Sequence, residues 1–368
     1  MNSLVFKKIT DSGLALMLLS ALLVFTALHQ ARAQERKGPH LPSRLPSGLP
    51  SGPCPSSCYP VRITDAEGRQ ILITRPFKRI ISLYPAHSEN LILLGAVDSL
   101  AAVSRGRLHL PEEGQSRTQA DSLPRVSFRD DPERLLALKP DLVLIRPMIS
   151  RAHPGLVERL RSQGVCVVSL QPSRASDLYG YWMKLGLLSG RAAEAERMIQ
   201  GFRQELSEME ALVAGIPEEK RPKVYFEAIH SRMKTFAPGS IAIFALERAG
   251  GINIAADAFQ VRSTNIAAYG KERILAKADL IDVYLAQKGR MNRVSVPDIL
   301  NEPGFQVIKA VREGRVYLVD EALVSRPTPR LMEGIRLIHR LLYGKAKDHG
   351  PDGARPAADQ GPAQEVPQ

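Results

Sequence analysis

The sequence predicts an α/β fold of two lobes with mostly parallel central sheets, joined by one long rigid α-helix. Short apolar runs recur along the chain with helical segments between them. Most of these runs are continuous rather than alternating, as in parallel strands that are covered on both faces. A long amphipathic segment divides the chain into two parts of similar length. The chain has 368 residues, which exceeds one ordinary core and favours two domains.

Strands are expected where the apolar runs of strand length lie. These runs are Arg79–Leu83, Leu100–Val103, Leu142–Ile145, Val165–Leu170, Val224–Ala228 and Val283–Ala286. Helical segments are expected between them, for example at Pro132–Leu138 and at Pro154–Gln163, where Gly164 ends the helix. Cys166 lies inside an apolar run, so we expect it to be a buried strand residue.

The segment from Arg191 to Val213 predicts the connecting helix. It contains no Pro, and Gly201 is its only Gly. Its apolar residues recur every three or four positions and form one stripe, at Ala195, Met198, Ile199, Phe202, Leu206, Met209 and Leu212. A helix of this length spans roughly 35 Å, the height of a domain. We therefore expect an N-terminal lobe at 61–188, the interlobe helix at 189–216 and a C-terminal lobe at 217–344.

The two parts contain similar strings, which favours a pair of related lobes. The first holds ERLLALKPDLVLI (133–145) and the second ERILAKADLIDVYL (272–285). In each, Glu-Arg opens a short helix, Lys and Asp follow, and an apolar strand comes next. Helix-turn-strand units share chemistry, so chance remains an alternative. Two lobes leave a cleft between them, which is a common place for a ligand.

The N-terminus has the pattern of an export signal at 1–33. Lys7 and Lys8 precede an uncharged, largely apolar run at 13–28, and Ala31-Arg32-Ala33 has the form that a signal peptidase cleaves. A membrane anchor is the alternative, but the run is shorter than the roughly 20 residues that cross a bilayer. No Cys follows a small-residue pattern at the cleavage point itself, which argues against a lipid anchor. We expect a periplasmic protein, secreted through a cleaved signal peptide in a diderm bacterium.

Two segments of the mature chain are too rich in Pro, Gly and polar residues to bury a core. They are a flexible spacer at 34–60 and a disordered tail at 345–368. Cys54 and Cys58 lie in the spacer, and an oxidising compartment would allow them to pair. A metal site is the alternative for these two thiols, but no His lies near enough to complete one. The sequence leaves the disulfide open.

The formal net charge is +12, and most of it falls within 61–344. A basic exported domain can meet anionic lipid, nucleic acid or an anionic small molecule. The Lys and Arg residues are scattered, and no aromatic-interleaved nucleic-acid motif is present. The charge therefore favours an anionic solute and no nucleic-acid partner.

Four strings in order along the chain resemble a known family. They are KRIISLYPAHSENLILLGAVDSLAAVS (78–104), DPERLLALKPDLVLI (131–145), LVERLRSQGVCVVSL (156–170) and SRPTPRLMEGI (325–335). Together with the long helix they resemble the periplasmic-binding proteins of ABC importers for iron-siderophore complexes, cobalamin and haem. The resemblance covers about 61–344. It implies two lobes bridged by a rigid helix, with a cleft that closes only slightly on its ligand.

The resemblance also implies partners. A monomer would deliver its ligand to the membrane permease of an ABC importer, and it would need no cofactor of its own, although the ligand can contain iron or cobalt. Family members place one exposed Glu on each lobe to meet arginines of the permease, and the matching positions are Glu133 and Glu272. Each Glu also suits a helix N-terminus because it complements the helix dipole, and the sequence does not separate the two roles.

Ligand contacts are expected at strand ends and in the turns after them. The candidates in the first lobe are Tyr84, His87, Arg105, Arg146 and Met148, and those in the second are His230, Arg262, Tyr284, Lys288 and Arg326. The planar fork of Arg suits carboxylate or phosphate groups, and Tyr stacks on a flat ligand. Simpler interpretations of the two histidines exist: His87 caps a helix, or His230 lies in a loop.

The favoured function is a solute receptor for an anionic metal chelate, such as a ferric siderophore, or for a corrinoid such as cobalamin. An enzyme or chelatase-like protein on the same scaffold is one alternative, but the chain has no Gly-rich phosphate loop, Gly-x-Ser-x-Gly or His-Glu-x-x-His motif. A receptor for a bare transition-metal ion is another, but no spacing adds ligands to His87 and His230. A binding protein without a transporter is a third. The sequence does not identify the solute.

Overall fold

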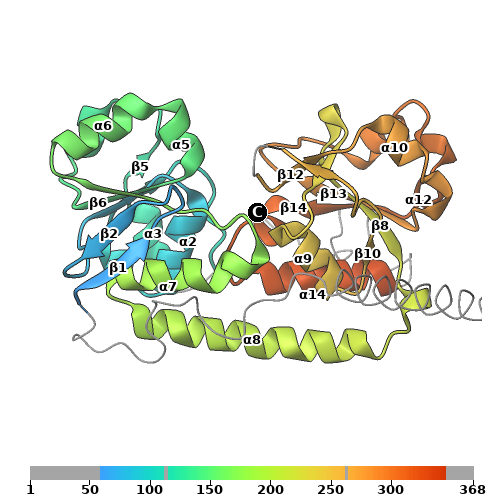
Figure 1. Cartoon of the computed structure of the whole chain (residues 1–368), viewed down its shortest axis with the longest axis horizontal. Coiled ribbons are helices and arrows are strands. Elements are labelled where there is room, and N and C mark those ends of the chain that lie inside the picture. Colours follow the sequence, from blue (N-terminus) through green and yellow to red (C-terminus); the bar gives the residue numbers. More distant parts are fainter. Residues whose placement is uncertain (1–58, 112–114, 262–263, 345–368) are drawn as a thin grey trace, which may run out of the picture. The chain divides into compact units, whose positions relative to one another are not determined.

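A computed structural model describes residues 59–111, 115–261 and 264–344. The predicted signal peptide and tail, residues 34–58 of the predicted spacer (which include Cys54 and Cys58) and Arg262 lie outside these residues. Helices and strands alternate along the described chain. The strands form two separate central sheets, and helices surround them (Figure 1). None of the helices described is long and apolar enough to cross a membrane.

The first sheet has five parallel strands in the order β5-β4-β3-β6-β7. The strands are β3 (Ile80–Ser82), β4 (Leu100–Ser104), β5 (Arg125–Val126), β6 (Leu142–Ile145) and β7 (Cys166–Ser169). The chain runs outward from β3 to β5 and then returns to place β6 on the other side of β3. The strand order therefore reverses between β3 and β6, and in such sheets ligands bind beyond the carboxyl ends at this point.

Helices and one hairpin surround this sheet. The hairpin pairs β1 (Val61–Thr64) with β2 (Gln70–Ile73). The helices are α2 (Pro85–Leu93), α3 (Gln115–Ser122), α4 (Pro132–Leu136), α5 (Pro147–Ala152), α6 (Pro154–Ser162) and α7 (Leu178–Ser189). Four of them begin with Pro, which has no N–H to leave unpaired and whose φ already suits a helix. These prolines set where the chain turns from each strand end into the next helix.

The second sheet is mixed, so the expected parallel order applies to only part of it. Its strand order is β11-β12-β9-β8-β13-β14, and β10 pairs with β8. Strands β8, β10, β13 and β14 are parallel, whereas β9, β11 and β12 add in antiparallel pairs. The strands are β8 (Lys223–Ile229), β9 (Lys234–Phe236), β10 (Ile252–Asn253), β11 (Phe259–Gln260), β12 (Ile266–Ala268), β13 (Val283–Lys288) and β14 (Val316–Asp320).

Six more helices belong to the described part of the second half, and the last two follow its final strand. They are α9 (Ile241–Arg248), α10 (Lys271–Leu275), α11 (Val296–Leu300), α12 (Lys309–Arg312), α13 (Glu321–Val324) and α14 (Leu331–Tyr343). Both halves also contain short turns of 3₁₀ helix. They lie at Val97–Ser99, Ala175–Asp177, Glu218–Lys220, His230–Arg232, Ala278–Leu280 and Phe305–Val307.

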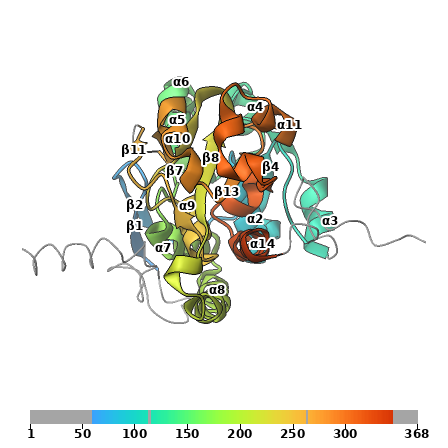
Figure 2. The same cartoon turned by 90° about the vertical axis from the view of Figure 1, so that its right-hand side faces the viewer.

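The long helix α8 (Ala192–Ala214) lies where the apolar stripe predicted it. It packs against α7 from the first half and against α9 and α14 from the second, and Figure 2 shows it end-on below them. Buried side chains of all four helices belong to one continuous hydrophobic cluster, which includes Trp182, Phe202, Phe244 and Ile338. The two halves therefore share a core instead of meeting only through a linker.

A second connection joins the motif at 78–104 to the motif at 325–335. The carbonyl oxygen of Pro327 accepts hydrogen bonds from Asn90 Nδ2 and from Trp182 Nε1, both at 2.9 Å. Beside it, Arg326 Nη1 lies 2.5 Å from Glu89 Oε1, and both side chains are largely buried. Residues that are distant in sequence thus hold α2 and α7 against the segment between α13 and α14.

Candidate functional site

The first part of the candidate site lies where the strand order of the first sheet reverses. Tyr84 follows β3, Arg146 follows β6, and the guanidinium carbon of Arg146 is 4.4 Å from the centroid of the Tyr84 ring. Arg146 Nε also donates to Gln171 Oε1 at 3.0 Å. Met148, in the first turn of α5, is 43% exposed and leaves an apolar group at the same edge. The structure therefore brings three predicted residues to one sheet edge.

His87 does not present its side chain to a ligand in this conformation. It is completely buried, with Nδ1 2.7 Å from the Tyr181 hydroxyl and Nε2 3.2 Å from the Ile145 carbonyl oxygen. Burial lowers the pKa of His87 to about 3, so the ring is neutral. His87 therefore does not make the direct ligand contact that was predicted. It supports Tyr84 instead, because its ring packs edge-on against the Tyr84 ring with 5.0 Å between the centroids.

Arg105 reaches solvent at the carboxyl end of β4, beside β3. Its guanidinium pairs with Asp130 at 2.9 Å, and half of the side chain is exposed. Surface pairs of this kind are weak, so the pairing does not prevent Arg105 from meeting a solute.

Arg326 is engaged at the junction of the two halves. It pairs with Glu89 at 2.5 Å and lies 3.8 Å from Glu321, and only 11% of its side chain is exposed. Burial raises the pKa of Tyr84, while the nearby charges of Arg146 and Arg326 lower it and those of Glu89 and Glu321 raise it. Tyr84 thus lies within the electrostatic influence of both halves. The charge of Arg326 is already neutralised by Glu89, which gives this residue a structural role.

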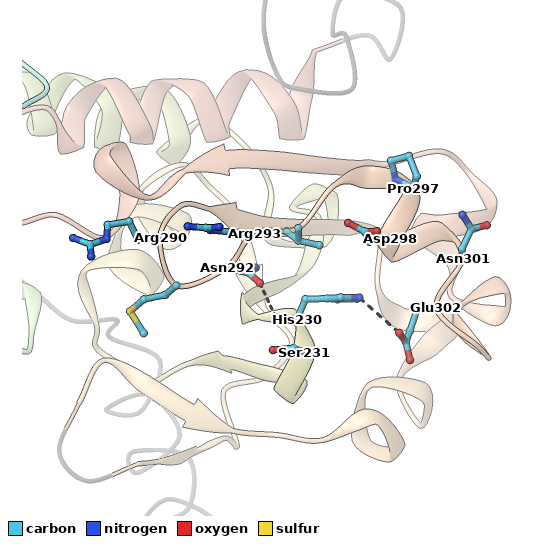
Figure 3. A pocket seen from close by; sticks show the side chains of 11 residues that line it. His230, Ser231, Arg290, Asn292, Arg293, Pro297, Asp298, Asn301 and Glu302 are labelled. Carbon is cyan, nitrogen blue, oxygen red and sulfur yellow. Dashed lines mark hydrogen bonds and ion pairs between the residues drawn. The ribbon is translucent and has the colours of Figure 1, made fainter. Parts of the chain in front are cut away.

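The second part of the candidate site is a pocket of about 680 Å³ at the carboxyl ends of β8 and β13 (Figure 3). Its lining comes from the turn after β8, the segment after β13, helix α11 and the residues after that helix. The lining residues are His230, Ser231, Arg290, Met291, Asn292, Arg293, Val294, Pro297, Asp298, Asn301 and Glu302. Carboxyl ends of parallel strands in both sheets are therefore the places where polar side chains gather.

Glu227, which bonds to the lining residues His230 and Asn292, is completely buried. Its carboxylate accepts hydrogen bonds from His230 Nδ1 at 2.8 Å, from Asn292 Nδ2 at 3.3 Å and from the Tyr284 hydroxyl. A buried carboxylate needs such donors because it has lost its hydration. Tyr284 is itself completely buried. Tyr284 therefore holds the Glu227 carboxylate in place and does not make the ligand contact that was expected.

The pocket carries several positive charges. The hydrogen bond to Glu227 raises the pKa of His230 above its usual value, and the charges of Glu302 and Asp298 act in the same direction, against burial. Arg290 and Arg293 are exposed, and neither forms a hydrogen bond or ion pair within the described part of the chain. Two unpaired guanidinium groups on a concave surface suit the carboxylate, phosphate or hydroxamate oxygens of a ligand.

Most of this pocket was not predicted from the sequence. Among the predicted residues that the structure describes, only His230 lines it, and Lys288, the exposed last residue of β13, is not part of the lining. The missed residues Arg290, Asn292 and Arg293 follow Lys288 directly. Ligands often contact the turns that follow strands. Applied to the observed end of β13 and to the turn as far as residue 293, this rule would have predicted all three residues.

The two predicted docking residues are both exposed at helix N-termini. Glu133 lies in the first turn of α4 with 61% of its side chain exposed, and it pairs with Arg159 at 2.7 Å. Glu272 occupies the matching position in α10. Exposure suits docking and dipole stabilisation equally, so docking stays a prediction.

The described residues contain no group of three or more His, Cys, Asp or Glu side chains that could hold a metal ion. Cys166 is a free, half-buried thiol at the start of β7, and burial raises its pKa.

Comparisons with known proteins agree with this geometry. The family described as periplasmic binding protein matches residues 80–323. An ABC transporter substrate-binding lipoprotein of Bacillus subtilis is 24% identical, over 77% of this chain and 86% of its own length. A cobalamin-binding protein of Halobacterium salinarum is 26% identical, over 75% and 72%. The crystal structure of the periplasmic vitamin B12-binding protein of Vibrio cholerae superimposes with a TM-score of 0.54 at 25% identity, over 73% and 97%.

Proposed function

Because this chain belongs to the periplasmic binding protein family, we propose that it is the solute receptor of an ABC importer. The receptor captures an anionic metal chelate or a corrinoid between the carboxyl edges of its two sheets and delivers it to a membrane permease. Proteins of this family bind solutes and do not transform them, and the proposal includes no enzymatic step. The export signal expected at 1–33 supports a periplasmic location.

The observation that supports the proposal best is the pocket in which Arg290 and Arg293, beside His230, have no partner among the described residues. In the first half, the Arg146 guanidinium lies over Tyr84 and offers a cation and an aromatic ring on a second surface. Arg326 and Glu89 form an ion pair between the two halves. A solute that bridged them would place anionic oxygens on arginine and a flat or apolar part near Tyr84 and Met148.

Two classes of solute fit, and different observations support each. The arginines favour a negatively charged ferric siderophore, such as the tris-catecholate complex ferric enterobactin. The names of the relatives from Halobacterium salinarum and Vibrio cholerae favour a corrinoid. In both cases the organic part of the solute supplies the ligands of its metal, so the protein needs no metal-binding residues of its own.

Binding of candidate solutes to the purified protein tests the proposal. We expect one of ferrichrome, ferric enterobactin, cyanocobalamin and haemin to raise the melting temperature and to bind with a stoichiometry of one. A solute at a hundred times its Kd would stabilise the protein by about 2.7 kcal/mol. Iron-free siderophores serve as controls, and the bound solute should be recovered unchanged. Stabilisation by none of the four, or chemical conversion of the solute, would contradict the proposal.

A further inference from the structure

The buried carboxylate of Glu227 is linked to the arginine-bearing segment 289–293 through Asn292. Asn292 Nδ2 donates to Glu227 Oε1 at 3.3 Å and to the Gln287 carbonyl oxygen at 2.9 Å. Asn292 Oδ1 accepts from the backbone N–H of His230 at 2.9 Å, and the Asn292 carbonyl oxygen accepts from the N–H of Gly289 at 3.0 Å. These bonds fold the segment back onto the strand ends, and Arg290 and Arg293 flank Asn292 on either side.

His230 closes the same network from the other strand. Its Nδ1 lies 2.8 Å from Glu227 Oε2, which also accepts from the Tyr284 hydroxyl, and its backbone N–H bonds to Asn292. His230 is only 14% exposed at its side chain, yet it lines the pocket. The side chain that bonds to the buried carboxylate therefore also lines the pocket.

The charged groups around His230 come from four elements. Glu227 lies on β8, Asp298 on α11, and Glu302 follows α11 with its carboxylate 3.7 Å from His230 Nε2. Lys271 of α10 pairs with that carboxylate at 2.5 Å. Arg290 and Arg293 line the same pocket. Loss of the His230 proton would leave Nε2 as a bare lone pair facing Glu302 and would remove one positive charge from the pocket.

We propose that the pair Glu227–His230 positions segment 289–293 and makes capture of an anionic solute strongest when His230 is protonated. The hydrogen bond from Glu227 favours the protonated ring, so the positive charge is present at low pH and is lost as the pH rises through the folded-state pKa, above 6.5. Affinity for an anion falls over the same interval. The solute half of this proposal rests on the proposed function, whereas the positioning half concerns the protein alone.

The positioning half is tested without any ligand. NMR titration of the purified protein should give His230 a pKa above 6.5, which falls in Glu227→Gln because the favourable charge is gone. Amide hydrogen exchange at 289–293 should accelerate in Glu227→Gln and in Asn292→Ala, while exchange in β3 and β6 stays unchanged. His339→Gln, in α14 and bonded only to the Ala249 carbonyl, is the matched control and should change neither quantity. If Glu227→Gln does not fold, Asn292→Ala alone decides the exchange result.

The solute half uses the anionic member of the four-solute panel that stabilises the protein, ferric enterobactin or haemin, because ferrichrome and cyanocobalamin carry no net negative charge. We expect its Kd to rise about fivefold between pH 6 and pH 8.5, since one charge near a partly solvated anion contributes on the order of 1 kcal/mol. The Kd of His230→Gln should be flat over that range and close to the wild-type value at high pH. A flat wild-type profile, or unchanged exchange in both variants, would overturn the inference. Failure of all four solutes to bind, with the exchange result intact, would instead count against the proposed function.

Discussion

Arginine residues at the candidate site differ in how their charges are engaged. Arg326 is buried against Glu89, and Arg105 is paired with Asp130 at the surface. Arg290 and Arg293 have no partner in the described ranges, and Arg146 contacts an aromatic ring and a neutral amide. Only the last three have a charge that remains uncompensated, so an anionic solute gains most from them.

The neutral state of His87 makes a prediction about acid stability. Its pKa of about 3 in the folded protein lies below the value of 6.5 expected when the chain unfolds, so unfolding takes up a proton at intermediate pH. The free energy of unfolding should therefore fall as the pH drops from 6.5 toward 3, with a contribution of about 1.4 kcal/mol per pH unit. His87→Gln should be less stable at neutral pH and should lose this part of the slope. Urea denaturation at several pH values measures both, and an unchanged slope in the variant would contradict the assignment.

At the scale of residues, the positions of strand ends can be predicted from the sequence better than the directions of the side chains that follow them. Tyr84, Arg146, Met148 and His230 follow strands that the apolar runs predicted, and they lie at the expected edges. His87 and Tyr284 also follow or belong to those strands, but they point into the core and bond to Tyr181 and to Glu227. The sequence contains no signal for this difference, because the partners lie 94 and 57 residues away.

The close crossing of α7 and α8 makes a prediction at the scale of elements. A Cβ at Gly186 would lie 2.7 Å from Ala195 Cβ, so Gly186→Ala must push the helices apart and should destabilise the protein by about 1–3 kcal/mol. A Cβ at Gly201 in α8 would meet nothing within 4 Å, so Gly201→Ala should stabilise it by about 0.5–1 kcal/mol. Denaturant titration compares the two substitutions. Equal effects would show that the helices do not cross as described.

Most of the strands that were missed differ from the predicted strands in their local pattern, but β14 is a buried apolar run and was also missed. Strands β3, β4, β6, β7, β8 and β13 are buried over most of their length and read as continuous apolar runs. Strands β5, β9, β10, β11 and β12 have only two or three residues each. Such short segments hold no periodic pattern, and their pairing depends on tertiary neighbours. This is why the second sheet was expected to be more parallel than it is.

At the scale of the molecule, the shared core and the bonds to Pro327 limit how far the two halves can move. Helices α7, α8, α9 and α14 contribute to one buried cluster, and Arg326 and Glu89 add an ion pair with little exposure. Breaking that pair would leave an unpaired buried charge. We therefore expect capture of a solute to involve small adjustments at the strand ends and not a large closure.

Docking to the permease is also a property of the whole molecule. Charge reversal by Glu133→Arg and Glu272→Arg should reduce solute uptake by intact cells without changing the Kd of the purified protein, because neither residue lies at the candidate site. Glu158→Arg and Glu313→Arg, exposed on the same two halves, are matched controls. Unchanged uptake in the double variant would remove the docking role and leave the two glutamates as helix N-terminal acids.

The central claim is that one solute is bound by the carboxyl edges of both sheets together. Calorimetric titration of the stabilising solute into three variants tests it most directly: Arg146→Ala on the first sheet, Arg290→Ala/Arg293→Ala on the second, and the exposed Arg151→Ala as control. We expect each of the first two changes to raise the Kd by about 10- to 100-fold, because charge-assisted hydrogen bonds to the solute are lost. The Kd of the control should match that of the wild type. A wild-type Kd in either of the first two variants would contradict the central claim.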